Sequence, residues 1–331
     1  MKNKNRIRLL VVTAVLLILF NIYLSSNYTV MAPGITIDLK DIVTVEGGHK
    51  KAQGSFFLTT VSSRSLNIPL LFYATVSPYV NIEQKEAVIP EGWSMNEYID
   101  YMQKWMQESQ KIAEVVALRK AGYEPKIYGD GAQVVEIMPE SPAQGKLFSG
   151  DIITEVDGKK VNLADEVVKI VSDHAINEDV EFKVKRNNKT HKILIPTIES
   201  KSEKGRAIVG IYITTFNWKP ILPLKIDIET GDIGGPSAGS MFAMEILNQL
   251  TDDDITRGYK IAGTGTISLD EKIGEIGGVE QKVVSAHRDG AKIFFCPEKN
   301  ASDARKIARN FDIKIVPVKE LDDIITYLED L

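Results

Sequence analysis

The stretch from Gly231 to Ser240, Gly-Asp-Ile-Gly-Gly-Pro-Ser-Ala-Gly-Ser, constrains the fold of this chain more than any other. Its glycines allow positive φ angles and let the backbone approach a bound molecule, and Pro236 suits the first turn of a helix, where its missing N–H costs nothing. We therefore predict a tight turn that places Ser237 at a helix N-terminus. Free backbone N–H groups and the positive end of the helix dipole would stabilise a developing oxyanion there.

A serine nucleophile needs a base, and the usual base is scarce. The chain has four histidines, which are His49, His174, His191 and His287. A second glycine-rich block, residues 264–282, ends instead in Lys282, at another expected helix start. The apolar residues expected around this lysine are Val279, Val283 and Ala286. Desolvation by these neighbours would lower the lysine pKa until the free amine can accept a proton, so Ser237 and Lys282 form a candidate Ser-Lys dyad.

These residues resemble the Lon-type serine proteases. That family carries a Gly-Pro-Ser-Ala-Gly turn, a Thr-Gly-x-Ile-x-Leu segment, an Ile-Gly-Gly and a Lys-x-x-x-Ala-His-Arg-x-Gly run. The matching blocks here stand in the same order, at residues 235–239, 264–269, 276–278 and 282–290, and the match continues through 297–300. Several ordered blocks are far more specific than a lone serine motif. The resemblance implies a Lon-type proteolytic domain over residues 200–331.

The resemblance also implies a role for each residue of the site. Lys282 would take the proton of Ser237 Oγ during attack on a peptide carbonyl and return it to the leaving amine. Thr264 matches a family threonine whose hydroxyl orients the lysine.

The backbone of the nucleophile turn would hold the oxyanion. The residues that the resemblance assigns to this part of the site are Gly234, Gly235, Pro236 and Ala238. ATP-driven members of the family often have an aspartate where this chain has Gly234, so Asp232 replaces that acid or the chain dispenses with it.

Composition and motifs exclude several classes of partner. A net charge of −5 argues against nucleic acid. No Gly-x-x-x-x-Gly-Lys-Ser/Thr loop occurs, so we expect neither nucleotide binding nor ATP-driven unfolding. We expect no cofactor and no metal, because the consecutive carboxylates of residues 252–254 point in different directions. Cys296, the single cysteine, lies in an apolar run and is expected to be a buried small hydrophobe and not a reactive thiol.

The N-terminus combines positive charge with a long apolar run. Its basic residues are Lys2, Lys4, Arg6 and Arg8, and the run from Leu9 to Phe20 is interrupted only by Thr13. At ~1.5 Å per residue, residues 7–24 just cross a ~30 Å hydrocarbon core, so an anchor and a signal peptide are both possible. No Ala-x-Ala-like site follows, which favours an uncleaved anchor over residues 1–26. The basic residues would keep the N-terminus in the cytoplasm and the rest outside the cell.

Residues 27–121 are expected to complete the protease fold or to link to it. Alternating apolar and polar positions predict strands over residues 28–90. Residues 94–120 carry apolar side chains at helical spacing, and this face is interpreted as packed core, with a peptide groove as the alternative. The residues of this face are Tyr98, Tyr101, Met102, Trp105, Met106, Ile112, Val115 and Val116.

Residues 122–199 resemble a PDZ domain of the protease-associated kind. The resemblance rests on a strand at 131–138, a Pro-capped Ser-Pro-Ala, a Gly-Asp turn at 150–151 and an Asp-Gly hairpin at 157–158. PDZ domains bind a peptide tail as an added strand, with its carboxylate held by a loop. That loop would be Tyr128-Gly129-Asp130-Gly131, although Asp130 is an odd neighbour for a carboxylate. A PDZ fold used only as a spacer or as a grip for internal segments is the alternative.

We therefore predict an α+β chain with a transmembrane helix and a Lon-type domain of mixed sheets and helices, with the PDZ domain inserted into it or preceding it. A polar linker over residues 200–206 would lead back to the protease. This layout resembles the SepM/YlbL-type membrane-anchored Lon-like proteases of Gram-positive bacteria, which implies ATP-independent cleavage of peptides at the outer face of the membrane. The alternatives are a non-catalytic PDZ receptor or adaptor and a His-Asp-Ser protease. An oligomer and a monomer are both compatible with the sequence.

Overall fold

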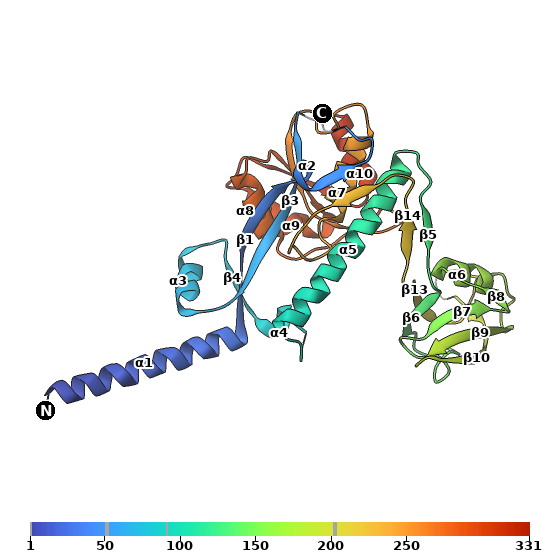
Figure 1. Ribbon diagram of the computed structural model, residues 1–331, viewed down its shortest axis with the longest axis horizontal. Helices are drawn as coiled ribbons and strands as arrows, with labels where there is room; N and C mark the ends of the chain where they lie inside the picture. The colour runs from blue at the N-terminus through green and yellow to red at the C-terminus, as the bar shows by residue number, and fades with distance from the viewer. Residues whose placement is uncertain (1, 50–52, 91, 201–203) are drawn as a thin grey trace. The chain divides into compact units, whose positions relative to one another are not determined.

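The computed structural model describes residues 2–49, 53–90, 92–200 and 204–331 of the chain, which divides into two compact units (Figure 1). Unit 1 consists of Met1–Glu124 and Pro223–Leu331, and unit 2 is Pro125–Leu222. Unit 2 is therefore an insertion in the chain of unit 1. The sequence predicted a boundary at residue 200, but the strand β13 (Ile211–Thr215) pairs with β6 (Ala132–Ile137) inside unit 2. Of the linker expected over residues 200–206, residues 201–203 lie outside the described part.

Unit 1 is built on a six-stranded sheet in the order β20-β19-β16-β3-β1-β4. Its strands are β1 (Tyr28–Asp38), β3 (Ser55–Ser65), β4 (Asn81–Gln84), β16 (Lys260–Gly263), β19 (Ile293–Pro297) and β20 (Lys314–Val318). The four strands from β20 to β3 run parallel, whereas β1 and β4 are antiparallel to their neighbours. Every residue of β19 is buried, as is typical of a parallel strand covered on both faces. Cys296 lies in this strand and is fully buried, as its apolar surroundings predict.

The helices of unit 1 include one long element that begins where the sequence indicates. The helix α5 (Met95–Lys120) starts at a capping box in which Ser94 and Glu97 bond each other's backbone N–H groups. The other helices are α2 (Leu39–Ile42), α3 (Ile68–Val76), α4 (Lys85–Val88), α7 (Gly239–Leu250), α8 (Val279–Arg288), α9 (Ala301–Ala308) and α10 (Leu321–Glu329). Two short pairs complete unit 1, β2 (Val43–Val45) with β15 (Ile226–Ile228) and β17 (Thr266–Ile267) with β18 (Ile273–Gly274).

The prediction of strands throughout residues 28–90 was wrong at α3 and at the shorter helices α2 and α4. The helix α3 follows Asn67, whose side chain accepts a hydrogen bond from Leu70 N–H, and Pro69 occupies its first turn. An Asn cap followed by proline is a helix start signal. The continuous apolar run after it obscures the helical period.

The N-terminal helix α1 (Lys2–Asn27) contains a segment, Lys4–Asn27, that is long and apolar enough to cross a membrane. Its large apolar side chains from Ile7 to Phe20 are between 46% and 69% exposed. Exposure of so much apolar surface to water is unfavourable, and the rest of the protein covers little of this surface.

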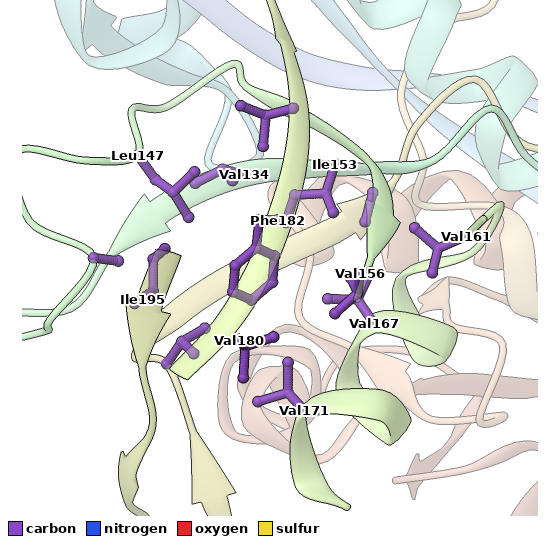
Figure 2. Packing of buried hydrophobic residues seen from close by; sticks show 14 of the residues in the cluster. Val134, Leu147, Ile153, Val156, Val161, Val167, Val171, Val180, Phe182 and Ile195 are labelled. Atoms are coloured by element: carbon purple, nitrogen blue, oxygen red, sulfur yellow. The ribbon is translucent and has the colours of Figure 1, made fainter. Parts of the chain in front are cut away.

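Unit 2 contains a second sheet in the order β10-β9-β7-β6-β13, with β8 on β7. Besides β6 and β13, its elements are β7 (Ile152–Val156), β8 (Lys159–Lys160), α6 (Ala164–Ser172), β9 (Asp179–Arg186) and β10 (Lys189–Pro196). Figure 2 shows the core between this sheet and α6, where Phe182 lies among Val156, Val167 and Val180. Two short pairs also belong to unit 2, β5 (Lys126–Tyr128) with β14 (Lys219–Ile221) and β11 (Ile198–Glu199) with β12 (Ala207–Ile208).

Candidate active site

Three side chains that the sequence singled out meet in unit 1. Lys282 Nζ lies 2.7 Å from Ser237 Oγ and 2.9 Å from Thr264 Oγ1. The Thr264 hydroxyl donates in turn to the backbone oxygen of Ser237, at 3.0 Å. The lysine amine is therefore held between the serine hydroxyl and a threonine that is itself bonded to the serine backbone. Among the described contacts, Lys282 is the one side chain bonded to Ser237 Oγ.

The sheet and two helices bring these residues together. Thr264 directly follows the central strand β16, and its N–H donates to Phe295 O on the neighbouring strand β19. The next residue, Gly265, donates its N–H to Ser237 O at 2.7 Å, which fastens the nucleophile turn to the end of the strand. Lys282 lies in the first turn of α8, with its N–H bonded to Gly278 O. Ser237 and Lys282, although far apart in the sequence, thus meet at the end of β16, because the turn before α7 and the first turn of α8 both lie there.

Burial lowers the pKa of Lys282. Its side chain is 3% exposed, and desolvation lowers its pKa from the ordinary 10.5 to about 7. An uncharged amine next to a serine hydroxyl can accept that hydroxyl's proton, so the pKa lies where a general base works best near neutral pH.

Some backbone N–H groups of the nucleophile turn donate hydrogen bonds within the protein, and others do not. Gly235, at φ +96°, donates its N–H to Met102 O, and Pro236 has none to give. In the described part of the chain, the N–H groups of Gly234, Ser237 and Ala238 have no backbone or side-chain acceptor. Two of these adjoin the nucleophile, where an oxyanion would form. Because α7 begins only at Gly239, Pro236 lies in the turn ahead of the helix and not in its first turn as predicted.

A cleft of ≈ 550 Å³ opens over this centre. Both Ser237 and Lys282 line it, and Asp232 and Glu275 contribute carboxylates. The apolar residues that β1, β3 and α5 contribute to its lining are Met31, Leu58, Val61, Tyr98, Met102 and Met106. An extended peptide could place an apolar side chain against this wall with its carbonyl near the serine.

The helix α5 has a role that the sequence did not reveal. Met102 O accepts the N–H of Gly235, and Ser109 Oγ donates to Pro236 O at 2.9 Å. Part of the predicted apolar face does pack as core, but Tyr101 and Trp105 are 39% and 46% exposed. The sequence feature that could have indicated this contact is Ser109, a small polar residue within an otherwise apolar face. In the structure its side chain is 3% exposed. A buried serine of this kind needs a partner, and here the partner is the nucleophile turn.

A groove in unit 2 lies between α6 and β13, the end strand of the sheet. Its volume is ≈ 90 Å³, and its lining includes Val167, Val168 and Val171 of α6 together with residues 206–211. Gly210 has φ +67°, and in the described part of the chain the N–H groups of Val209 and Gly210 have no acceptor. Free N–H groups beside an apolar groove and an open strand edge suit an extended peptide.

The predicted peptide loop, Tyr128 to Gly131, does not line this groove. Asp130 N–H donates to Phe216 O and Gly131 N–H to Asn162 O, so both donors are occupied within unit 2. The Asp130 carboxylate accepts from the Asn217 side chain. Tyr128 ends the strand β5 and is 60% exposed.

The other polar candidates lie in contacts of their own. His287 stacks on Phe311 at 4.4 Å between ring centroids, and His49 Nε2 lies 3.5 Å from an Asp252 carboxylate oxygen. Asp254 accepts hydrogen bonds from the Thr256 N–H within its own turn and from the Gln53 N–H of a distant segment. In the described residues no cluster of three potential metal ligands occurs.

Comparison with known proteins matches two regions of the chain to domain families. Residues 224–329 match the sequence model of the Lon protease (S16) C-terminal proteolytic domain, and residues 108–197 match that of the PDZ domain. The PDZ match begins within α5 of unit 1, whereas unit 2 begins at Pro125 and continues beyond the match to Leu222.

Two curated relatives are both named Lon protease. That of Mycoplasma pneumoniae is 38% identical over 136 residues, which cover 39% of this chain and 17% of the relative. That of Trichlorobacter lovleyi is 39% identical over 93 residues, covering 28% of this chain and 11% of the relative. The chain thus spans less than a fifth of the length of either relative.

Among solved structures, the chain is similar to two PDZ domains of SdrC-like proteins. That from Listeria monocytogenes is 26% identical, with a TM-score of 0.24 and coverage of 25% of this chain and 87% of that one. That from Listeria innocua is 29% identical, with the same TM-score and coverage of 25% and 93%. Similarity at this TM-score supports no argument alone, and the assignment rests on the sequence match. The chain thus contains a Lon-type proteolytic domain and a PDZ domain, behind an N-terminal helix long and apolar enough to cross a membrane.

Proposed function

We propose that this protein is an ATP-independent serine endopeptidase that works by a Ser-Lys dyad at the outer face of the cell membrane. The observation that carries the proposal is the 2.7 Å contact between Lys282 Nζ and Ser237 Oγ, in a site where the lysine pKa falls to about 7. A lysine held for structural reasons alone would be expected on the surface or beside an acid.

The geometry of the site supports the following reaction. Neutral Lys282 takes the hydroxyl proton as Ser237 Oγ attacks a peptide carbonyl carbon, and the carbonyl oxygen becomes an oxyanion. The N–H groups of Ser237 and Ala238 stabilise that oxyanion. The lysine ammonium then gives its proton to the leaving amine, and water hydrolyses the acyl-enzyme with the same lysine as base. Thr264 keeps the amine aimed at the serine throughout.

The cleft indicates the kind of substrate. Its apolar wall of Met31, Leu58, Met102 and Met106 favours an apolar side chain next to the scissile bond. These 331 residues contain no phosphate-binding loop that could drive unfolding, so substrates are extended peptides and flexible segments. Secreted signalling peptides are one such class. The groove between α6 and β13 would capture a peptide segment as an added strand.

The charge pattern of the N-terminus supports the location. Lys4, Arg6 and Arg8 precede the apolar span, and basic residues at one end of a span favour the cytoplasmic side. Both units would then lie outside the membrane on the opposite side.

Peptide hydrolysis without nucleotide tests the proposal. The wild-type chain is compared with Ser237→Ala, Lys282→Ala and, as a matched control, His287→Phe, which preserves ring stacking on Phe311. We expect wild type and the control to cleave, and the first two variants to fall to background while still unfolding cooperatively in urea. Equal activity in Ser237→Ala and wild type would refute the dyad. Cleavage lost in His287→Phe with its fold intact would favour a histidine base instead.

A PDZ receptor or adaptor on a protease scaffold is the second candidate, because the groove in unit 2 suits a peptide whether or not the chain cleaves it. If a broad peptide library binds to wild type but is never cut, even at pH 8 to 9, the binding function stands and the protease function falls.

A further inference from the structure

The helix α3 presents an apolar face that the fold leaves uncovered. Residues 65–82 contain no charged side chain, and eight of the nine residues of α3 are apolar or aromatic. Three of them, Phe72, Tyr73 and Val76, are 72%, 44% and 63% exposed. At spacings of three and four residues they form one stripe along the helix. Soluble surfaces seldom carry so large an apolar stripe on so short an element.

The opposite face of α3 is already used to hold the helix against the end of α1. Leu24 of α1 is buried in a cluster with Val30, Leu66 and Val80, and the inward residues of α3 pack on that cluster. These inward residues are Ile68, Leu70, Leu71 and Ala74. The exposed stripe therefore serves no purpose in the packing of unit 1.

The backbone N–H groups at the N-terminus of α3 need no water as a hydrogen-bond partner. Ile68 N–H donates to Asn21 Oδ1 of α1 at 3.1 Å, and Leu70 N–H donates to Asn67 Oδ1. Pro69 has no N–H, and Leu71 N–H bonds to Asn67 O. The first-turn donors that a surface helix usually leaves to water are thus all satisfied by protein. Such satisfaction is what the interior of a bilayer demands.

The contact with Asn21 also sets the depth of α3. Asn21 lies three residues before Leu24, where the apolar span ends, which is ~4.5 Å along the helix axis. Helices that lie in the membrane interface bury their apolar face ~5–10 Å into the boundary between headgroups and acyl chains. Tyr23 and Trp93, 54% and 40% exposed, add the aromatic side chains that favour the headgroup level.

We propose that α3 is a second membrane contact, which lies in the outer interface beside α1 with Phe72 and Val76 among the acyl chains. This inference rests on the proposed anchoring by α1. Two contacts fix the orientation of unit 1 on the membrane, whereas a single span would leave it free to swivel. The catalytic cleft of unit 1 is then held at a constant orientation to the lipid surface.

Depth-dependent quenching tests the proposal on the full-length chain in vesicles of phosphatidylcholine and phosphatidylglycerol. An environment-sensitive fluorophore is attached to Phe72→Cys, to Val76→Cys, to Leu16→Cys in the span, and to Asp303→Cys on the exposed face of α9. We expect little background from the native thiol, because Cys296 is fully buried and burial raises its pKa to about 12. We expect nitroxide-labelled acyl chains to quench positions 16, 72 and 76 several-fold and to leave position 303 unchanged.

The outcomes separate this inference from the proposed anchor. Quenching at position 16 without quenching at 72 or 76 overturns the role of α3 and leaves the anchor intact. A fluorophore at 72 and 76 that shifts to the blue without lipid quenching also overturns it, because a second copy or another protein then covers the stripe. Failure at position 16, with protein that does not float with the vesicles, removes the anchor and this inference together. Urea midpoints equal to that of wild type show that each variant is folded.

Discussion

Burial alone lowers the pKa of Lys282 enough for part of the amine to be uncharged at neutral pH, and this predicts how activity depends on pH. The folded pKa of about 7 means that the amine is protonated and inactive below pH 7 and free above it. We expect kcat/KM for a short peptide to rise about tenfold per pH unit below pH 7 and to level off above it. A profile that is flat between pH 5.5 and 8.5 would contradict Lys282 as the base.

The lowered pKa of Lys282 also destabilises the fold, and it does so in a way that depends on pH. The unfolded chain keeps the Lys282 proton up to about pH 10.5, whereas the folded chain loses it near pH 7. Unfolding therefore takes up a proton between these values, so this residue destabilises the fold most below pH 7 and progressively less toward pH 10.5. We expect Lys282→Met to stabilise the protein at pH 6 by up to about 5 kcal/mol, since the pKa shift of about 3.5 units is worth about 1.4 kcal/mol per unit, and the lost hydrogen bonds to Ser237 and Thr264 offset part of this gain.

Urea unfolding of wild type and Lys282→Met from pH 6 to pH 10 checks this sign. The difference in midpoint should shrink as the pH rises. A difference that is independent of pH would mean that packing, and not the charge, sets the stability at this position.

Thr264 is expected to act through Lys282 and not on the substrate. Thr264→Val keeps the shape but removes the hydroxyl between the amine and Ser237 O. We expect kcat to fall about 10–100-fold with KM nearly unchanged, because the amine loses its aim. Thr264→Ser should restore most of the activity. A loss in both variants alike, with lower urea midpoints, would indicate a structural role only.

At the scale of residues, the sequence predicted the side chains of the site but not all of their backbone surroundings. Ser237, Lys282 and Thr264 meet because their blocks form strand ends and helix starts, which local patterns reveal. The hydrogen bond from Gly235 N–H to Met102 O joins segments more than 130 positions apart, and local pattern carries no information about such a pair. The choice of candidate oxyanion donors therefore needed the structure.

At the scale of elements, α5 and α7 pack so closely at the nucleophile turn that one added methyl group should be felt. A Cβ at Gly239 would lie 2.6 Å from Ser109 Oγ and 2.7 Å from Ile267 Cγ2. We expect Gly239→Ala to lower the free energy of unfolding by about 1–3 kcal/mol and to reduce activity. Gly277→Ala is the matched control for stability, since no atom lies within 4 Å of its Cβ. Equal urea midpoints for the two variants would show that the helices can separate at no cost.

The elements that the sequence predicted well are those with clear start signals. The capping box at Ser94 marks α5 to the residue, whereas α3 was hidden in an apolar run without a visible period. The groove of unit 2 was misplaced for another reason. Its strand β13 comes after the matched PDZ region, and only the pairing of β13 with β6 shows that it completes the sheet.

At the scale of the whole molecule, the two ends of unit 2 lie side by side. The strands β5 and β14 pair antiparallel with Lys126 opposite Ile221, and partners in such a pair lie ~5 Å apart. The chain of unit 1 is therefore interrupted at what is geometrically a single point. Insertions of this kind, with adjacent ends, leave the host domain able to fold by itself.

Removing unit 2 should therefore spare the chemistry and impair only the capture of longer substrates. We expect a chain in which a short Gly/Ser linker replaces Pro125–Leu222 to keep wild-type hydrolysis of short peptides within roughly threefold. For substrates that also fill the groove between α6 and β13, KM should rise while kcat stays. Val168→Glu in the intact chain, where Val168 is 39% exposed in the groove, is the matched control and should reproduce the rise in KM. Loss of short-peptide cleavage in the shortened chain, with Val168→Glu fully active, would mean that unit 2 supports the catalytic unit itself and does not deliver substrates to it.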